Sequence, residues 1–311
     1  MPQVAPPAPQ RGRHRGQLFA TRRSRYVIGG AAGIVILAVI VLLAVVILPG
    51  QISGKSGPGA APAQSSSPAP ATSHAATPTP SPTITAPLAG SWKLKFDDEF
   101  NGPSLDTSVW STGWFGSGET NPVSDLEDDC YDPSQVVQTG GDLDLNLIKK
   151  ATSCDGGNDY STGAVSTAGK YTFTYGLIQA RIWVPASQGD VANWPAFWAD
   201  GKHWPEDGEI DIAEGLGGDM CAHLHNEAKP DGIGPGCPSG LYAGGWHTFA
   251  ANWEPDSLTF YYDGKDIGSV TNGVTSAPMF LVLDYATGTA GGPTLAPATM
   301  KVDYVRVWQH S

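Results

Sequence analysis

The chain has 311 residues and a formal net charge of −12, with 30 acidic and 18 basic residues. Seven basic residues and no acidic residue precede position 91, so residues 91–311 hold 11 basic against 30 acidic residues, a net charge of −19. So acidic a region repels nucleic acids and sulfated polymers, which excludes a nucleic acid partner. It leaves a neutral partner, or solubility alone, as the reason for the charge.

The N-terminus has the pattern of a membrane anchor. Residues 1–26 contain six arginines and no acid, and residues 27–48 form an unbroken apolar run of 22 residues. About 20 apolar residues let a helix span a bilayer, and arginines stay on the cytoplasmic side. We therefore predict a basic cytoplasmic tail and a transmembrane signal-anchor helix in the cell membrane, with the rest of the protein outside.

The alternative is a signal peptide that is cleaved, followed by secretion. The apolar core of a signal peptide is only about 7 to 15 residues long, and a small-residue cleavage site follows closely. Here the nearest such site, Ala61–Ala63, lies far downstream. This distance favours a retained anchor.

Residues 49–90 have the composition of a linker. They are mainly Pro, Ala, Ser, Thr and Gly, with Lys55 as the single charged residue. Such a segment cannot bury a core. We therefore predict that the folded domain covers residues 91–311, a length that suits one large all-β domain.

From residue 91 onward, apolar and polar residues alternate as they do in β-strands. Such alternation recurs at residues 142–148, 177–184, 248–254, 258–262, 279–286 and 301–308. Asp263 and Gly264, between two of these stretches, are a strong hairpin signal. We predict an all-β fold, a jelly-roll sandwich of antiparallel strands with one face curved into a groove.

All four cysteines, Cys130, Cys154, Cys221 and Cys237, lie in the predicted extracellular part. They lack the C-x-x-C spacing of a zinc site, so disulfides are the natural interpretation. Three connectivities are possible. The sequential one closes two local loops, each worth about 3 kcal/mol.

The stretch DGEIDIAEGLGG, residues 207–218, concentrates acids within an apolar strand. In a strand Glu209 and Asp211 share one face, while the isoleucines between and after them face the core. Glu214 follows Asp211 by three residues. It reaches the same face only if a β-bulge near Ile212 or the next residue adds one position.

Three carboxylates on one strand face suit the cleavage of a glycosidic bond. Two of them can flank the bond as nucleophile and acid if their carboxyl groups approach the roughly 5 to 5.5 Å of a retaining glycosidase. Close like charges raise at least one pKa, so one acid can stay protonated near neutral pH. Two other interpretations are a solvent-facing strand decorated with acids and a calcium site.

Aromatic residues and histidines flank this motif in the sequence. Trp194, Trp198 and Trp204 precede it, and flat aromatic faces bind sugar rings. His223 and His225 follow it, two residues apart and so on one face of a strand. Each Trp suits the core as well as a binding site, and His223 can equally be a core residue.

These motifs resemble glycoside hydrolase family 16, in particular the bacterial laminarinase-type β-glucanases, over Trp92–Gln309. The similar stretches are FDDEFNGPSLDTSVW, STGAVSTAGKYTFTYGLIQARI, NWPAFW, GEIDIAE and VDYVRVW. The resemblance implies a concanavalin A-like jelly roll. It also implies an enzyme that cuts internal β-linkages in neutral glucans, galactans and related polymers.

The resemblance also implies roles for individual residues. Glu209 corresponds to the nucleophile, Glu214 to the acid/base and Asp211 to the assisting carboxylate. The expected substrate-binding residues are Trp194, Trp198, Trp204, His225 and Asn226. No cofactor is required, but some members hold a structural calcium, and Asp303 is the residue to inspect for it.

Three residue pairs depart from the usual family pattern. They are Ala199–Asp200, Asn226–Glu227 and Asp284–Tyr285. We expect these positions to line the sugar subsites. They leave the reaction intact and put the identity of the polymer in doubt.

The sequence thus predicts a membrane-tethered, extracellular, retaining endo-β-glucanase that acts as a monomer on a polysaccharide, with β-1,3-glucan as the best single substrate. One alternative is a β-glucan-binding module without catalysis, although the presence of both glutamates speaks against it. The other is a transglycosylase, which passes the covalent intermediate to another sugar instead of to water.

Overall fold

The computed structural model describes residues 84–154 and 157–311. The predicted cytoplasmic tail, the signal-anchor at 27–48 and the linker up to residue 83 lie outside the described residues. Within the described residues, no helix is long and apolar enough to cross a bilayer.

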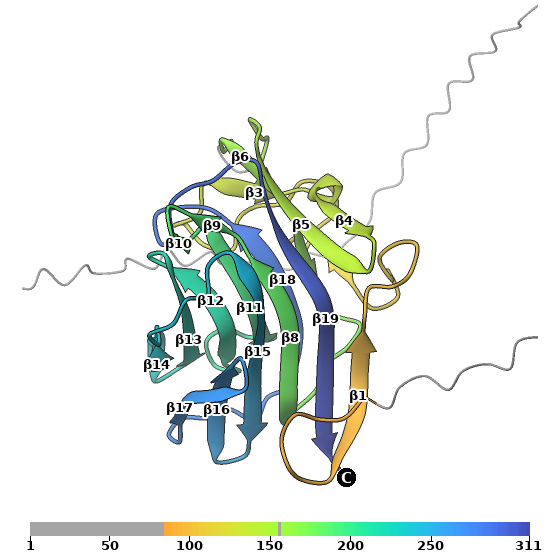
Figure 1. Cartoon of the computed structure of the whole chain (residues 1–311), viewed down its shortest axis with the longest axis vertical. Helices are drawn as coiled ribbons and strands as arrows, with labels where there is room; N and C mark the ends of the chain where they lie inside the picture. The colour runs from red at the N-terminus through yellow and green to blue at the C-terminus, as the bar shows by residue number, and fades with distance from the viewer. Residues whose placement is uncertain (1–83, 155–156) are drawn as a thin grey trace, which may run out of the picture. The chain divides into compact units, whose positions relative to one another are not determined.

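The larger of two β-sheets has ten strands (Figure 1). They are β1 (Trp92–Asp98), β3 (Asp129–Tyr131), β4 (Val136–Thr139), β5 (Asp142–Lys149), β6 (Tyr160–Thr162), β8 (Gly176–Val184), β15 (Gly245–Glu254), β16 (Ser257–Tyr262), β17 (Lys265–Val270) and β19 (Ala298–His310). Their order is β17-β16-β15-β8-β19-β5-β6-β3, with β1 beside β19 and β4 beside β5. Only the pair of β3 and β6 is parallel among the described strands of this sheet.

The smaller sheet has seven strands, all paired in antiparallel fashion. They are β2 (Ser111–Thr112), β7 (Ala164–Ser166), β11 (Trp194–Gly201), β12 (Glu209–Leu216), β13 (Asp219–Asn226), β14 (Lys229–Gly236) and β18 (Met279–Ala286). Their order is β14-β13-β12-β11-β18-β7-β2. A short ribbon of β9 (Ala186–Ser187) and β10 (Asp190–Val191) and the 3-10 turn η1 (Pro133–Gln135) complete the described elements.

One hydrophobic core fills the space between the two sheets. It joins residues such as Ile178 and Phe249 of the larger sheet to Ile210 and Leu283 of the smaller one. Because side chains alternate along a strand, the opposite face of the smaller sheet is turned away from this core. We call it the outer face. It carries Trp194, Trp198, Asp200, Glu209, Asp211, Glu214, His223, His225, Phe280 and Asp284.

The predicted sandwich is confirmed. The six predicted strands coincide with β5, β8, β15, β16, β18 and β19. Asp263 and Gly264 turn the chain between β16 and β17, both with positive φ, 49° and 74°. A type I′ hairpin turn requires positive φ at both positions.

The folded region begins earlier than the predicted boundary at residue 91. Ile84, Ala86 and Leu88 are half-buried and pack against a small cluster that contains Leu177 and Trp308. The surrounding Pro and Thr residues give this segment the composition of the linker. Its alternating apolar side chains nevertheless pack against the larger sheet.

Both disulfides follow the sequential connectivity. Cys130 bonds to Cys154, 24 residues away. Cys221 on β13 bonds to Cys237, which comes directly after β14 and is 16 residues away. The second bridge therefore fastens the edge of the smaller sheet.

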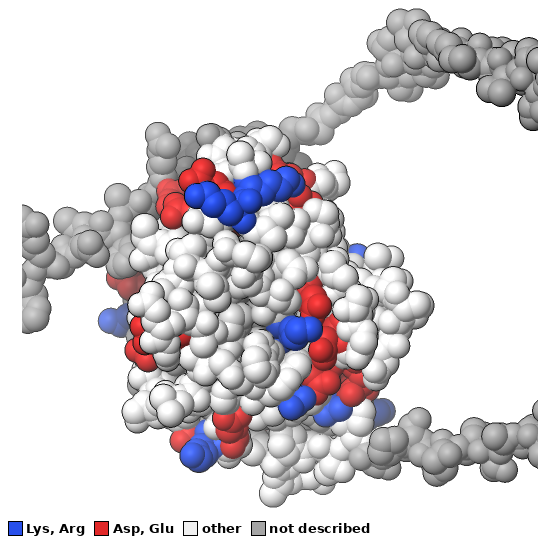
Figure 2. All heavy atoms as spheres, turned by 45° about the horizontal axis from the view of Figure 1, so that its top comes forward, with Lys and Arg blue, Asp and Glu red and all other residues white. Residues whose placement is uncertain are grey.

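Charged side chains gather in a few mixed groups on the surface shown in Figure 2, with wide uncharged areas between them. Several acids are paired with the few basic residues. Lys301 lies 2.9 Å from Asp144, and Arg306 lies 3.2 Å from Asp97. Ion pairs thus offset a part of the acidity.

The early start of the folded region can be tested with Leu88→Ala. The variant should lower the free energy of unfolding by about 1 kcal/mol, because a half-buried leucine loses most of its apolar contact. Leu241→Ala is the control, since Leu241 is 91% exposed and its loss should change stability by less than about 0.5 kcal/mol. Urea denaturation of both variants measures the difference; equal stabilities would contradict the packing of Leu88.

Candidate active site

The three acids of β12 lie on the outer face because of a β-bulge. Across to β11, Asp211 is opposite Trp198 and Ala213 is opposite Phe197, so Ile212 has no partner of its own. Ile212 and Ala213 both lie in the core. The extra residue restores Glu214 to the face of Glu209 and Asp211, as the sequence predicts.

Glu214 is held by one residue on each side. The indole Nε1 of Trp194 donates to Glu214 Oε1 at 3.1 Å. His223 Nδ1 lies 3.4 Å from Glu214 Oε2. Both of these neighbours come from the strands next to β12, so the carboxyl group has a defined orientation.

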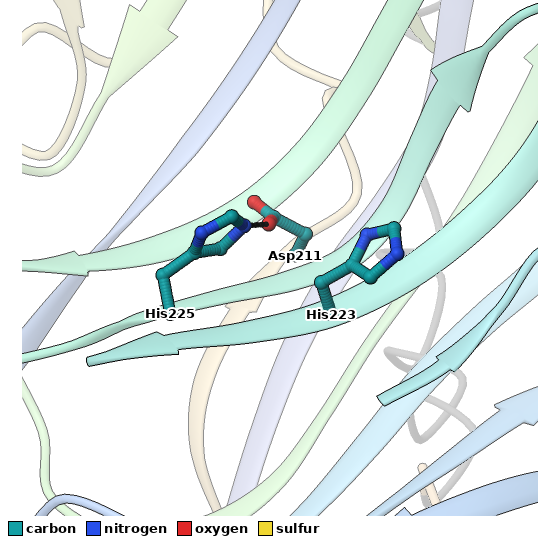
Figure 3. Close-up of side chains that lie close together, drawn as sticks. All are labelled: Asp211, His223 and His225. Carbon is teal, nitrogen blue, oxygen red and sulfur yellow. Dashed lines mark ion pairs between the residues drawn. The ribbon is translucent and has the colours of Figure 1, made fainter. Parts of the chain in front are cut away.

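Asp211 is paired with His225 (Figure 3). His225 Nε2 lies 2.8 Å from Asp211 Oδ2, and His225 Nδ1 lies 2.9 Å from the carbonyl oxygen of Pro230. A carbonyl oxygen only accepts hydrogen bonds, so Nδ1 carries a proton. A second proton then lies between Nε2 and the carboxyl oxygen.

The pKa values of these groups are linked. Burial raises the pKa of Asp211 well above its usual value, and the charges of Glu209 and Glu214 add to this effect. Burial opposes a charge on His225, but the hydrogen bond and charge of Asp211 raise the pKa of His225 to about 10. The imidazolium therefore offsets the negative charge gathered on β12.

Glu209 occupies the other end of the acidic row. It lies between His225 on β13 and Asp200 on β11 in the strand register. Burial raises its pKa, whereas the charge of His225 and hydrogen bonds with Asp211 and Trp204 lower it. The charge of His225 and the hydrogen bond with Asp211 thus partly offset the effect of burial on Glu209.

Asp200 adds a fourth carboxyl group to the outer face. It is only 6% exposed, and its Oδ1 has no hydrogen-bond partner among the described residues. Burial raises the pKa of Asp200 to about 8, and the charge of Glu209 contributes. Ala199 of the same pair lies in the core, so only Asp200 keeps the predicted place beside the site.

The predicted binding residue Trp198 is only 6% exposed. Its ring stacks on Trp114, with centroids 5.4 Å apart and planes at 28°. Trp114 in turn contacts Phe115, which is 67% exposed. The aromatic surface near Trp198 is therefore extended by two residues that the sequence motifs miss, because they come from a distant loop.

Trp204 is 44% exposed and lies near Glu209, and its part in substrate binding stays a prediction. The structure does not bring Asn226 to the outer face. Asn226 is buried, donates to the carbonyl of Gly273 at 2.9 Å and accepts from the amide of Lys229 at 2.8 Å. Because side chains alternate along a strand, the side chain of Asn226 points to the other face of β13 from that of His225.

Tyr285 also corrects an expectation. We expected the pair Asp284–Tyr285 to line sugar subsites, but Tyr285 is fully buried in the core, where Asn193 Nδ2 donates to its hydroxyl at 2.6 Å. Asp284 does lie on the outer face and accepts from Trp198 Nε1 at 2.7 Å. Every residue of β18 is buried, so its sequence has no alternation of polar and apolar residues that would show which of Asp284 and Tyr285 faces the core.

Two places bear on metal binding. Ligand atoms of Asp211, His223 and His225 lie within 4.8 Å of one another, but the pair of Asp211 and His225 already explains this grouping. Asp303, the residue considered for calcium, lies 2.7 Å from Arg181 Nη1. A cation there would have to compete with the guanidinium.

Comparison with known proteins agrees with this geometry. A family model described as glycosyl hydrolases family 16 matches residues 123–306, more than half of the chain. The chain belongs to this family. The matched residues include all of β12.

Two relatives and one solved structure show the extent of the similarity. Glucan endo-1,3-beta-glucosidase A1 from Niallia circulans is 30% identical over 73% of this chain and 39% of its own length. Endo-1,3-1,4-beta-glycanase ExsH from Rhizobium meliloti (strain 1021) is 32% identical over 68% of this chain and 51% of its own. The structure of an endo-beta-1,3-glucanase from Pyrococcus furiosus has a TM-score of 0.62 and 27% identity, with 73% and 99% coverage.

The chain therefore spans about half or less of these two relatives, but nearly all of that solved structure. The match to the family model, residues 123–306, includes most strands of both sheets of the sandwich, among them the acidic strand β12.

The burial of Asp200 predicts a pH effect on stability. Its pKa is about 8 in the folded protein against an ordinary value of 3.8, so the folded state binds the proton more tightly than the unfolded state. Stability should therefore fall as the pH rises from about 4 to about 8. Asp200→Asn should reduce this fall in stability, whereas the control Asp190→Asn, at an exposed carboxyl, should not. Thermal unfolding at pH 4, 6 and 8 measures the fall in each variant. Parallel pH curves for the two variants would contradict the buried, protonated Asp200.

Proposed function

We propose that this family 16 protein is a retaining endo-β-glucanase. The observation that carries the proposal is the pair of Glu209 and Glu214 on one face of β12, each with its own partners. The two glutamates thus differ in surroundings, as a nucleophile and an acid/base must.

In the first step Glu209 attacks the anomeric carbon, and Glu214 gives its proton to the leaving glycosidic oxygen. The bond between the sugars breaks and a glycosyl ester of Glu209 forms. Glu214, now ionised, then takes a proton from water, which attacks the same carbon and releases Glu209. Asp211 and His225 stabilise the charge of Glu209 before attack and after release.

A neutral β-glucan is the substrate class that the surroundings support best, with β-1,3-glucan as the first choice. Relatives from several organisms are described as glucan endo-1,3-beta-glucosidases or endo-1,3-1,4-beta-glycanases. A net charge of −19 after residue 90 disfavours polyanionic polymers. Trp194, Trp204 and Phe115 offer aromatic surface for sugar rings.

We further propose that the apolar run at 27–48 holds the enzyme at the cell membrane as a monomer, with the sandwich outside. The length of that run and the six arginines before it support this placement. The two disulfides fit an oxidising exterior. Secretion after cleavage is the alternative, and detection of the intact N-terminus in membrane fractions distinguishes the two.

The roles of the two glutamates can be tested by substitution. Glu209→Gln and Glu214→Gln should each lower kcat by several orders of magnitude with little change in Tm, because both replacements keep the shape of the side chain. Asp211→Asn should have a milder effect, since Asp211 acts through Glu209. Exogenous azide should restore turnover of an activated substrate to the acid/base variant, made as Glu214→Ala, but not to Glu209→Gln. Full activity in either glutamine variant would contradict the mechanism.

The substrate can be identified with the full chain in detergent, as wild type and Glu209→Gln. Each is incubated with laminarin, mixed-linkage β-glucan, xyloglucan and agarose, while new reducing ends and product sizes are followed. Cleavage of laminarin by the wild type alone supports the proposal. Products longer than the starting oligosaccharide would show transglycosylation, and binding without cleavage would show a binding module.

A further inference from the structure

A second group of acids surrounds Tyr131, on elements other than β12, and only Asp284 of this group lies on the outer face. Glu127, Asp129 and Asp284 are 9%, 0% and 5% exposed. None of the three forms an ion pair with a basic side chain in the described part of the chain. Buried carboxylates without counter-charge are costly, so the group needs protons or a cation.

Tyr131 shows where a proton is needed. Its hydroxyl oxygen lies 2.9 Å from Glu127 Oε2 and 3.3 Å from Asp284 Oδ2, and it is fully buried. A phenol has one proton and so donates one hydrogen bond. If both carboxyl groups were ionised, the Tyr131 proton could lie toward only one of them, and the other carboxylate oxygen would face the phenol oxygen with no proton between. One of the two acids must therefore be protonated.

Burial raises the pKa of Glu127 well above its usual value and that of Asp284 to about 7, so burial does not decide between the two acids; their hydrogen bonds do, and these make Asp284 the better carrier of that proton. The two oxygens of Glu127 already accept from the backbone amides of Val123 at 3.1 Å and Ser124 at 3.0 Å, and such bonds favour the ionised form. On Asp284, Oδ1 accepts from Trp198 Nε1, but the partner of Oδ2 is Tyr131 alone. A proton on Oδ2 completes a chain from Asp284 through Tyr131 to Glu127 in which every donor has an acceptor.

Geometry favours a proton over a cation. Among the described residues, the group whose ligand atoms lie within 4.8 Å of one another is Asp211, His223 and His225. The three acids around Tyr131 are too widely spaced to meet that condition. Three buried carboxyls that do not converge on one point are poor ligands for a single ion.

On the basis of the proposed function, we propose that Asp284 is a neutral carboxylic acid that positions Trp198 beside the active site without adding negative charge next to Glu214. Asp284 and Glu214 flank the same residue of β11, Ala196, from its two neighbouring strands. An ionised Asp284 would therefore confront the acid/base across one strand. The stack of Trp198 on Trp114 transmits the position of the indole to the aromatic surface.

The groups that face Asp284 from the surrounding elements are Trp198 on β11, Glu209 and Glu214 on β12, Tyr131 and Asp129 on β3, and Glu127 in the loop before β3. Burial, with the charges of Glu209 and Glu214, raises the pKa of Asp284 to about 7, although the hydrogen bond that it accepts from Trp198 lowers it. Ionisation above neutral pH should thus weaken both the network and catalysis.

Asp284→Asn tests this proposal, because asparagine is neutral at every pH and can still donate to Tyr131 and accept from Trp198. Asp128→Asn, at an exposed carboxyl between Glu127 and Asp129, is the matched control. Both variants and the wild type are used as the full chain in detergent. We would measure the infrared band of protonated carboxyl groups, Tm and laminarin cleavage at pH 5.5 and 8.5.

The wild type and Asp128→Asn should lose a carboxylic acid band between pH 5.5 and 8.5 that Asp284→Asn lacks throughout. The ratio of activity at pH 8.5 to that at pH 5.5 should be at least about threefold higher in Asp284→Asn than in the wild type, and its Tm should fall less. An unchanged band and unchanged ratios would overturn the proposal. So would a rise of Tm with added Ca²⁺ in the wild type that Asp284→Asn abolishes.

Should Asp284→Asn fail to fold, Trp198→Phe asks the same question. Loss of the indole N–H removes a hydrogen bond that favours the ionised form, so the band should disappear at a higher pH than in the wild type; an unmoved midpoint overturns the proposal. The infrared and Tm readouts need no substrate. They therefore test Asp284 even if no polymer is cut, and a failure of Asp284 leaves the roles of Glu209 and Glu214 untouched.

Discussion

Three carboxyl groups share one face of β12 because a β-bulge at Ile212 and Ala213 inserts one residue into the strand. The repulsion between these carboxyl groups must be offset by the residues around them. Like charges that are close and partly buried repel one another, and their pKa values rise unless donors or opposite charges lie near. The neighbouring strands supply both: β11 contributes the indole of Trp194, and β13 contributes His223 and His225.

The fold fixes these partners at the required positions. Cys221 lies opposite Glu214 in the register of β12 and β13, and its disulfide to Cys237 joins β13 to the chain beyond β14. His223 and His225, whose imidazoles face the acids, therefore lie on a strand that pairs with β12 on one side and with β14 on the other. On the other side, β11 is paired along its whole length with β18. The outer face is thus a rigid support, and such rigidity is what positions reacting groups for catalysis.

Much of this could be predicted from the sequence, because the relevant signals are local. The spacing of Glu209, Asp211 and Glu214 contains the bulge, and strand alternation places His225 beside them. The same alternation, applied one residue further, would have turned Asn226 away from the site. By contrast, no local pattern reveals that Trp114 covers Trp198, since a loop more than 80 residues upstream makes that contact. Tyr285 and Asp284 lie on a strand buried on both faces, so only the packing decides which of them faces the site.

In the proposed mechanism Glu209 forms a covalent bond to the substrate, while Glu214 serves as acid and base. This mechanism can be tested most directly by mass spectrometry of peptides after incubation with the 2-deoxy-2-fluoro β-fluoride of a β-1,3-linked glucose disaccharide. The fluorine at C2 slows hydrolysis of the glycosyl-enzyme. We expect one added glycosyl group, on the peptide that contains Glu209, and none in Glu209→Gln. A label on another carboxyl group, or inactivation without any label, would contradict this mechanism.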